Sequence, residues 1–391
     1  MKKQEVNMIS NEHKKHSDIA RPSLGNFGRN EFAIVGTTCG NIQALAGDVM
    51  KALSPKYKCA YIDAEHSDKN DALKSQDAFV KYTDKISFRE LQYKNEPDKF
   101  QFHQLFNETD LILVNGNHNE AAAQIVVIDK VKEASLLKRV KQLNNVQLIL
   151  LNDNVDGIFD FVKQAVPGWQ SLPMLSLYET SNIIDFFQNR LTKNLPVLNG
   201  LVLAGGKSVR MGFDKTSLEW HGKAQRNYIA DMISPLCSNV FISCREDQRE
   251  AIMGYETITD SFAGLGPYGA ILSAFRSNPD AAWLVVASDL PLMDEATLQY
   301  LADRRDASAI ATTFESPFDG FPEPLITIWE PKAYAILLSF LAQGYSCPRK
   351  ALRNNNVHII KAEHPEKLMN VNTQDELEKA TALLQTKISS L

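Results

Sequence analysis

The sequence predicts an α/β protein with two domains, each built on a mainly parallel sheet. The chain has 391 residues, which is long for one average domain. Short apolar runs alternate along it with stretches of helical spacing, the pattern of strands joined by crossover helices. A short polar segment at 192–198 holds Pro196 and is typical of a linker. We therefore expect domains over 31–191 and 199–391.

Each element is predicted from its local pattern of apolar residues. Strands are expected at Phe32–Val35, Cys59–Ile62, Leu111–Val114, Val126–Ile128, Val146–Leu151, Gly200–Leu203, Val240–Cys244, Trp283–Ala287 and Ala309–Thr312. Helices are expected at Ile42–Leu53, Lys130–Leu143, Ser181–Leu191, Ala224–Leu236, Gly269–Arg276, Glu295–Arg304, Pro331–Gln343 and Thr373–Leu384. Thr373 and Glu376 form the pattern of a capping box for the last helix.

Composition limits the class of partner and the compartment. Residues 1–30 are polar and are expected to form a flexible or loosely docked arm without a signal peptide. The formal net charge is −5, so no overall basic field favours nucleic acid or an anionic membrane. The five cysteines show no metal-ligand spacing, and no apolar run is long enough to span a bilayer. We expect a soluble cytoplasmic protein.

The segment Leu201–Lys215, with the sequence LVLAGGKSVRMGFDK, has the features of a phosphate-binding loop. An apolar strand leads to Gly205 and Gly206, whose backbone N–H groups can approach an anion closely. Arg210 and Lys215 add two cations that suit phosphate oxygens. A glycine-rich turn with two surface cations is the alternative for the glycine pair alone, but it does not explain the whole segment.

This loop resembles the LAGGxSxRMGxDK signature of the molybdenum cofactor guanylyltransferases, within the Rossmann-like nucleotidyltransferases. The resemblance extends over about 199–391, through Asp260 before a GPYG turn, Asp289 in SDLP, EPL at 323–325 and NVNT at 370–373. It departs from the family at Ala224, where a proline is frequent. The resemblance implies a nucleotide site formed by Leu203, Ala204, Gly205, Gly206, Ser208, Arg210, Lys215, Asp260, Gly266, Pro267 and Asp289.

Asp289 is also a candidate ligand on physical grounds. It follows the apolar run WLVVA, so it is expected at the carboxyl edge of the sheet, where open α/β folds bind ligands. A carboxylate there can hold Mg²⁺ together with phosphate oxygens and water. A helix N-cap is the alternative role, although Asp294 is better placed for it. Asp260 is a second candidate metal ligand, or a contact to the ribose or to a turn N–H.

The acceptor site is expected from four further residues. The resemblance places Asn370 and Asn372 near the pterin substrate, with a simple polar turn as the alternative. Ser346 and Arg349 could contact the same anionic substrate or could begin a solvated helix.

The resemblance implies that a terminal phosphate of molybdopterin attacks the α-phosphorus of GTP and releases pyrophosphate. Arg210, Lys215 and Asp289 would be catalytic, with Mg²⁺ as cofactor and Asp289 and Asp260 as its ligands. GTP, molybdopterin or molybdenum cofactor, and proteins of cofactor synthesis or molybdoenzymes would be partners. Cytidylyl transfer, a sugar-phosphate acceptor, or a regulatory protein that binds GTP without turnover are the alternatives.

The first half begins like a strand that leads into a P-loop, at residues 32–41. A working P-loop ends in GK[ST], but Asn41 and Ile42 stand in place of Lys and Ser or Thr. With DAEH at 63–66 and LILVNG at 111–116, the segment 31–191 resembles the molybdopterin-guanine dinucleotide accessory GTP-binding protein, where Asn115 replaces an acidic residue. We expect a degenerate P-loop-like domain without GTPase activity. His66 and His118 could form a metal pair, but ordinary loop residues are the simpler interpretation.

Overall fold

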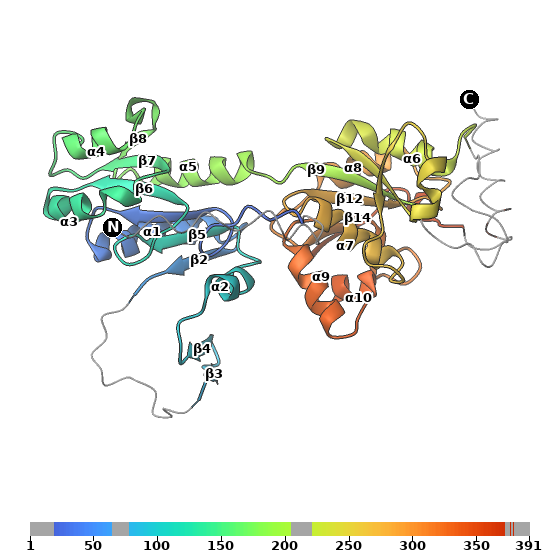
Figure 1. Ribbon diagram of the computed structural model, residues 1–391, viewed down its shortest axis with the longest axis horizontal. Coiled ribbons are helices and arrows are strands. Elements are labelled where there is room, and N and C mark those ends of the chain that lie inside the picture. The colour runs from blue at the N-terminus through green and yellow to red at the C-terminus, as the bar shows by residue number, and fades with distance from the viewer. Residues whose placement is uncertain (1–18, 65–77, 205–220, 372–375, 377, 379–391) are drawn as a thin grey trace, which may run out of the picture. The chain divides into compact units, whose positions relative to one another are not determined.

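The computed structural model describes residues 19–64, 78–204, 221–371, 376 and 378. The chain divides into two compact units, one over Ser23–Leu195 and one that contains the chain from Pro196 onward. Figure 1 shows a sheet with flanking helices in each of them. The division falls inside the segment 192–198.

The N-terminal unit is built on a six-stranded sheet in which every pairing is parallel, with the order β2-β5-β1-β6-β7-β8. Its strands are β1 (Glu31–Val35), β2 (Cys59–Ile62), β5 (Leu111–Asn115), β6 (Ala123–Ile128), β7 (Val146–Leu151) and β8 (Met174–Ser176). Buried strands such as β6 and β5 are mainly apolar, because both faces of the sheet are covered, and Asn115 ends β5 as a buried polar residue.

Helices cover both faces of this sheet. Helix α1 (Cys39–Leu53) and helix α5 (Thr180–Lys193) share one apolar cluster, while α3 (Glu133–Lys138) and α4 (Asp160–Ala165) bury side chains on the other face. Lys130–Leu143, predicted as one helix, is instead η1 (Lys130–Lys132), α3 and η2 (Val140–Gln142). The predicted periodicity does bury Leu136 and Leu143. The α-helical hydrogen-bond pattern ends at the C-cap Arg139, and the guanidinium of Arg139 donates to the carbonyl oxygen of Asn117 at 2.7 Å.

Between β2 and β5 the chain forms three elements that the sequence pattern does not predict. Strands β3 (Val80–Asp84) and β4 (Arg89–Tyr93) pair as an antiparallel hairpin, and α2 (Lys99–Leu105) follows. Apolar residues alternate with polar ones in both strands, but Val80, Tyr82, Leu91 and Tyr93 are exposed, so the hairpin packs on no core in the described chain.

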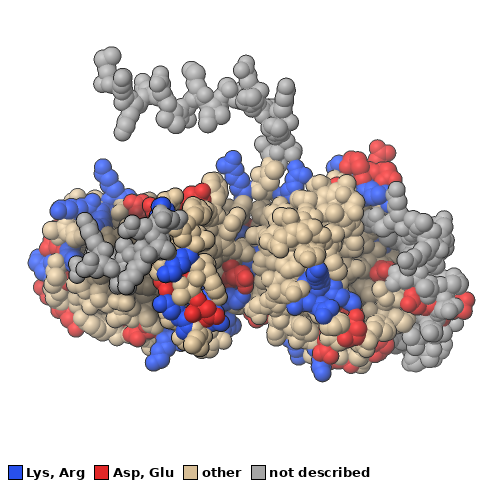
Figure 2. Space-filling view, turned by 90° about the horizontal axis from the view of Figure 1, so that it is seen from below, with Lys and Arg blue, Asp and Glu red and all other residues tan. Residues whose placement is uncertain are grey.

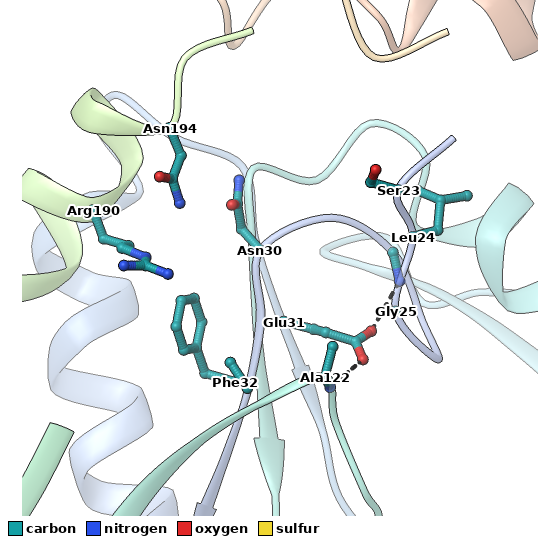
Figure 3. Close-up of a pocket in the computed structure, with 11 residues that line it drawn as sticks. Ser23, Leu24, Gly25, Asn30, Glu31, Phe32, Ala122, Arg190 and Asn194 are labelled. Atoms are coloured by element: carbon teal, nitrogen blue, oxygen red, sulfur yellow. Dashed lines mark hydrogen bonds between the residues drawn. The ribbon is translucent and has the colours of Figure 1, made fainter. Parts of the chain in front are cut away.

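The packed unit begins before residue 31, within the segment predicted as an arm. Phe27 is buried among aromatic rings of α2 and its flank, and three successive N–H groups, of Asn26, Phe27 and Gly28, donate to the carboxylate of Glu31. The N–H of Ala122 donates to the same carboxylate at 2.7 Å. Figure 3 shows Glu31 and Ala122, joined by their hydrogen bond, at one side of a cavity of about 310 Å³. The buried carboxylate therefore ties residues 26–28 to the sheet.

The C-terminal unit is built on a seven-stranded mixed sheet with the order β11-β10-β9-β12-β14-β13-β15. Only β14 runs antiparallel to its neighbours. The strands are β9 (Leu198–Leu203), β10 (Val240–Cys244), β11 (Glu256–Thr259), β12 (Ala282–Ala287), β13 (Ala311–Glu315), β14 (Pro322–Trp329) and β15 (Val357–Ile360).

Two apolar clusters lie on opposite faces of this sheet. Alternate residues of β9 and β12 enter one cluster with α6 (Gln225–Ile233) and α8 (Glu295–Asp303). The other residues enter a cluster with α7 (Pro267–Ser277), α9 (Ala333–Ala342) and α10 (Pro348–Arg353), the helices of the other side in Figure 1. Short 3₁₀ segments η3 (Trp169–Ser171), η5 (Ser234–Leu236), η6 (Glu246–Ala251) and η7 (Pro365–Leu368) complete the described chain.

The predicted helices and strands of this half are found within a few residues, and Asp294 is the N-cap of α8 as expected. Strands β11, β14 and β15 were not predicted, and β14 makes the sheet mixed rather than parallel. The helix predicted at Thr373–Leu384 lies outside the described residues apart from two positions.

The surface carries charges of both signs. Figure 2 shows Lys and Arg interspersed with Asp and Glu over the face it presents. Within the described chain, no helix combines the length and apolar composition needed to cross a bilayer.

Candidate active site at the edge of the second sheet

The site begins where the central strand β12 ends. Residues of β12 pair with β9 in parallel, so that Ala287 lies opposite Leu203. The hydroxyl of Ser288 then donates to the carbonyl oxygen of Leu203 at 2.7 Å. Asp289 follows and is half-buried. The chain also leaves β9 at this edge, through Ala204, so the predicted phosphate loop begins beside Asp289.

The antiparallel strand β14 brings a second set of polar groups to the same edge. Because β14 runs against β12, its first residues lie near the last residues of β12. Glu323 is therefore placed close to Asp289, and both line one pocket. Sequence reasoning noted Glu323 only as part of a motif, since the direction of β14 was unknown.

Arg349 joins this pocket from helix α10. Its guanidinium donates to Asp319 at 2.7 Å and to Glu323 at 3.5 Å. The pKa of Asp319 is lowered by the backbone N–H of Phe321 and by the positive charge of Arg349. Arg349 is thus held between two carboxylates, and sequence reasoning did not predict either contact.

The pocket has a volume of about 220 Å³. Its charged side chains are three carboxylates and one guanidinium, so the net charge of the lining is negative. Asn370, predicted from the NVNT segment, lines it together with Asp289 and Arg349. The complete lining is Ala287, Asp289, Leu290, Ser316, Phe318, Asp319, Glu323, Pro324, Leu325, Ile326, Arg349, Leu368 and Asn370.

The loop after β12 is held by its backbone carbonyl groups. Asp289 O accepts from the N–H of Val371 at 2.9 Å, which also fixes the neighbouring Asn370. Leu290 O accepts from Nε2 of the fully buried Gln225 at 3.2 Å. Pro291 O lies 3.1 Å from Nε2 of His221. Three successive carbonyl groups are therefore anchored to three separate segments, which fixes the course of the chain around Asp289.

Asp260 follows the edge strand β11, and its carboxylate stabilises the turn that begins there. Its Oδ1 accepts from the N–H of Phe262 at 2.8 Å and from the hydroxyl of Ser273 at 3.2 Å. Strands β10 and β9 separate β11 from β12, so the strand ends are about 14 Å apart at three spacings of about 4.8 Å. At this separation the two carboxylates are too far apart to share one metal ion. Asp289 is therefore favoured over Asp260 as the metal ligand.

The GPYG turn opens helix α7 as predicted. Gly266 has φ +57° and is the N-cap, and Pro267 is the first helical residue. At Gly269 a Cβ atom would lie 2.4 Å from the carbonyl oxygen of Phe262 and 2.9 Å from the carboxylate of Asp260. This glycine therefore permits a close approach between the turn and the helix.

The predicted site residues fall into three groups. Asp289, Arg349 and Asn370 come together in the pocket, with Leu203 and Ala204 at the same sheet edge. Asp260, Gly266, Pro267 and the exposed Ser346 are not among its lining residues. Gly205, Gly206, Ser208, Arg210, Lys215 and Asn372 lie outside the described residues.

The corresponding edge of the first sheet is closed by its own side chains. Asn41 Nδ2 donates to the hydroxyl of Thr37 at 2.9 Å, and this hydroxyl donates to the buried Asp129 at 2.6 Å. Burial would raise the pKa of Asp129, but hydrogen bonds from Thr37, Asn154 and a backbone N–H lower it. The side chains of Asn41, Thr37 and Asp129 are therefore hydrogen-bonded to one another.

A mixed α/β sheet with a carboxylate and a pocket at the carboxyl edge of its central strands places the protein in the class of open-sheet α/β proteins, which bind their ligands at this edge. Residues 200–359 match the model of the MobA-like NTP transferase domain. The probable molybdenum cofactor guanylyltransferase of Natronomonas pharaonis is 30% identical over 143 residues, which are 35% of this chain and 69% of that protein. The chain belongs to the MobA-like nucleotidyltransferase family through its C-terminal unit.

Two further relatives are similar to about half of the chain. The molybdenum cofactor biosynthesis bifunctional protein of Synechocystis sp. is 32% identical over 181 residues, covering 46% of this chain. The match spans about half of that protein, at 52% of its length. A crystal structure of molybdopterin-guanine dinucleotide biosynthesis protein A from Archaeoglobus fulgidus is 24% identical, covers 48% of this chain and 99% of that one, and has a TM-score of 0.42. The resemblance of residues 31–191 to the accessory GTP-binding protein stays a prediction.

Proposed function

We propose that the protein transfers GMP from GTP to a terminal phosphate of molybdopterin or molybdenum cofactor and releases pyrophosphate. The observation that carries this proposal is the position of Asp289, beside the exit of β9 into the LAGGKSVRMGFDK loop. Family membership supports the nucleotidyl transfer, and the names of the relatives support the guanylyl group and the acceptor.

The residues at this edge fit a magnesium ion. Mg²⁺ takes one or two protein carboxylates and completes its coordination with phosphate oxygens and water. Asp289 supplies such a carboxylate in a pocket where carboxylates outnumber cations. The described residues contain no cluster of three His, Cys, Asp or Glu that could hold a metal alone, so nucleotide phosphates would complete the site. When bound, the ion would neutralise phosphate charge.

The described side chains would position the reactants. Asn370 supplies amide groups at the rim, and Arg349 is held by Asp319 and Glu323 at a defined place in the wall. Such positioning lowers the barrier because phosphoryl chemistry depends on alignment and charge stabilisation. Arg210 and Lys215 remain the proposed cations for the phosphates of GTP, in line with their place in the motif.

We propose an accessory role for the N-terminal unit, such as scaffolding or presentation of the cofactor. Asn41 stands at the position of the P-loop lysine and bonds to Thr37 within its own loop. A phosphate-binding lysine is therefore replaced by a neutral side chain with an internal partner. We expect no Mg²⁺-dependent GTP hydrolysis from this unit.

The direct test is incubation of the full chain with molybdopterin, Mg²⁺ and each nucleoside triphosphate in turn, with detection of the dinucleotide and pyrophosphate. We expect product from GTP and its loss in Asp289→Asn. Asp303→Asn is the matched control, because Asp303 is the last residue of α8, its carboxylate accepts from Gln299 at 2.7 Å, and it does not line the pocket. Product from CTP alone would overturn the base assignment. No product from any triphosphate would overturn the proposal in favour of another acceptor or a regulatory protein.

A further inference from the structure

We propose that Cys39 and His118 in the N-terminal unit form a reactive thiol–imidazole pair whose substrate is a small hydroperoxide. The sulfur of Cys39 lies 3.4 Å from Nε2 of His118, within hydrogen-bond distance for sulfur. A thiol next to a base is the basic arrangement of an activated sulfur nucleophile. The pair lies in the N-terminal unit, apart from the proposed transferase pocket.

Parallel topology brings the two residues together. Cys39 is the first residue of α1, directly after the N-cap Thr38, and β1 leads into this turn. His118 follows β5, the parallel neighbour of β1, so both side chains belong to the carboxyl edge of the sheet. Cys39 is in the first turn of the 15-residue helix α1, at the end that carries the partial positive charge of the helix dipole.

A second donor also points to the sulfur. Asn117 Nδ2 lies 3.6 Å from the sulfur of Cys39 and 2.9 Å from the carbonyl oxygen of Thr37. The carbonyl oxygen of Asn117 accepts from Arg139 at 2.7 Å, and its N–H donates to the side chain of Asn115 at 3.1 Å. These contacts hold the turn that carries His118, so the donors are fixed before any reaction.

An acidic group, Asp63, lies within electrostatic reach of His118. Asp63 accepts hydrogen bonds from Tyr61 at 2.7 Å and from Asn115 at 2.7 Å. Burial would raise the pKa of Asp63, but these hydrogen bonds, a backbone N–H and the positive charge of His118 lower it. An ionised carboxylate within electrostatic reach stabilises the imidazolium that forms when His118 takes the thiol proton.

The other cysteines differ from Cys39. Burial raises the pKa of Cys59 to about 11 and the pKa of Cys237 to about 12, and it also raises that of Cys244. Their thiols are therefore poor nucleophiles at neutral pH. Cys347 is exposed and provides an accessible comparison within the same molecule.

The reaction is a two-electron oxidation of sulfur. The thiol proton moves to His118, and the thiolate attacks one oxygen of the hydroperoxide. An S–O bond forms as the O–O bond breaks, and the departing oxygen takes a proton from the imidazolium to leave as water or an alcohol. Cys39 becomes a sulfenic acid while the peroxide is reduced.

The test uses the full chain, limiting hydrogen peroxide and dimedone to trap the sulfenic acid, with mass spectrometry of the Cys39 and Cys347 peptides. We expect Cys39 to be trapped at least about tenfold faster than Cys347, although Cys39 is the less exposed thiol. His118→Gln should lower the rate at Cys39 about tenfold, because Gln keeps a donor but cannot take the proton.

His103→Gln is the matched control, since His103 bonds the carbonyl oxygen of Gly25 rather than a sulfur. It should leave both rates unchanged, and Cys347 should be unchanged in every variant. Equal rates at Cys39 and Cys347 in the parent would overturn the proposal. A fast Cys39 that is indifferent to His118→Gln would overturn the pairing. If the variant but not the parent is labelled at the half-buried Cys59, the variant has unfolded, and the parent ratio then decides.

Discussion

His221 tests whether the anchored loop after β12 positions Asp289. Its Nε2 lies 3.1 Å from the carbonyl oxygen of the buried Pro291, and its ring stacks on Tyr228 at 3.9 Å between centroids. His221→Phe keeps a ring for stacking but removes the donor. An unpaired buried carbonyl costs about 1–3 kcal/mol. If that cost falls on the geometry of Asp289 in the reacting complex, kcat should fall about 5- to 150-fold.

The assay is dinucleotide formation from GTP and molybdopterin as a function of Mg²⁺, next to a thermal melt. His221→Gln should recover much of kcat, because its amide can donate to Pro291 although it loses the stack on Tyr228. His364→Phe is the matched control, since the His364 side chain is exposed and its Nδ1 lies 3.4 Å from the exposed Glu366. A His221→Phe protein with parental kcat and parental Mg²⁺ dependence would refute the positioning role, as would a Gln variant no better than Phe.

Two further substitutions test the packing around the site by chemical denaturation. Gly269→Ala should destabilise the C-terminal unit by about 1–3 kcal/mol, because its Cβ would lie 2.4 Å from a backbone carbonyl oxygen. Gly47→Ala is the control, because it lies in open space on α1 and should stabilise the protein by up to about 1 kcal/mol. Equal effects of the two substitutions on the free energy of unfolding would contradict the steric argument. Arg305→Met should lower the free energy of unfolding by about 3–5 kcal/mol, because the carboxylate of the buried Glu330 loses its two hydrogen bonds from Arg305, at 2.6 and 2.9 Å. The double variant with Glu330→Gln should recover most of this stability. A cost below about 1 kcal/mol for Arg305→Met would show that the pair is not coupled to folding.

The sequence predicted the fold where apolar periodicity was strong. Buried strands such as β5 and β12 were found because both faces of the sheet are covered and each strand holds an unbroken run of at least four apolar residues. Strand β14 was missed because it contains Pro322 and Pro324, which are typical of loops. The exposed hairpin β3–β4 was missed because its short alternating runs, VKYTD and RELQY, lie within a strongly charged stretch of the chain.

The site was predictable only in part for a similar reason. Asp289 could be placed because it follows an obvious central strand, and an edge of the sheet is defined by chain direction. Glu323 and Asp319 could not be placed, since their position depends on the antiparallel course of β14. The anchors His221 and Gln225 act on backbone carbonyl groups, which leave no pattern in the sequence.

The two sheet edges differ in how their polar groups are used, and this difference argues for where the transfer takes place. In the N-terminal unit Asn41, Thr37 and Asp129 form a chain of hydrogen bonds within one loop, and a group that is bonded internally must break that bond before it can bind a phosphate. In the C-terminal unit the backbone of the Asp289 loop is anchored through its carbonyl oxygens, while its side chain lines an open pocket. A carboxylate held at a fixed backbone position beside a pocket is what ion and phosphate alignment requires. Nucleotidyl transfer is therefore expected at the edge of the C-terminal sheet. The edge of the N-terminal sheet carries the proposed thiol chemistry of Cys39.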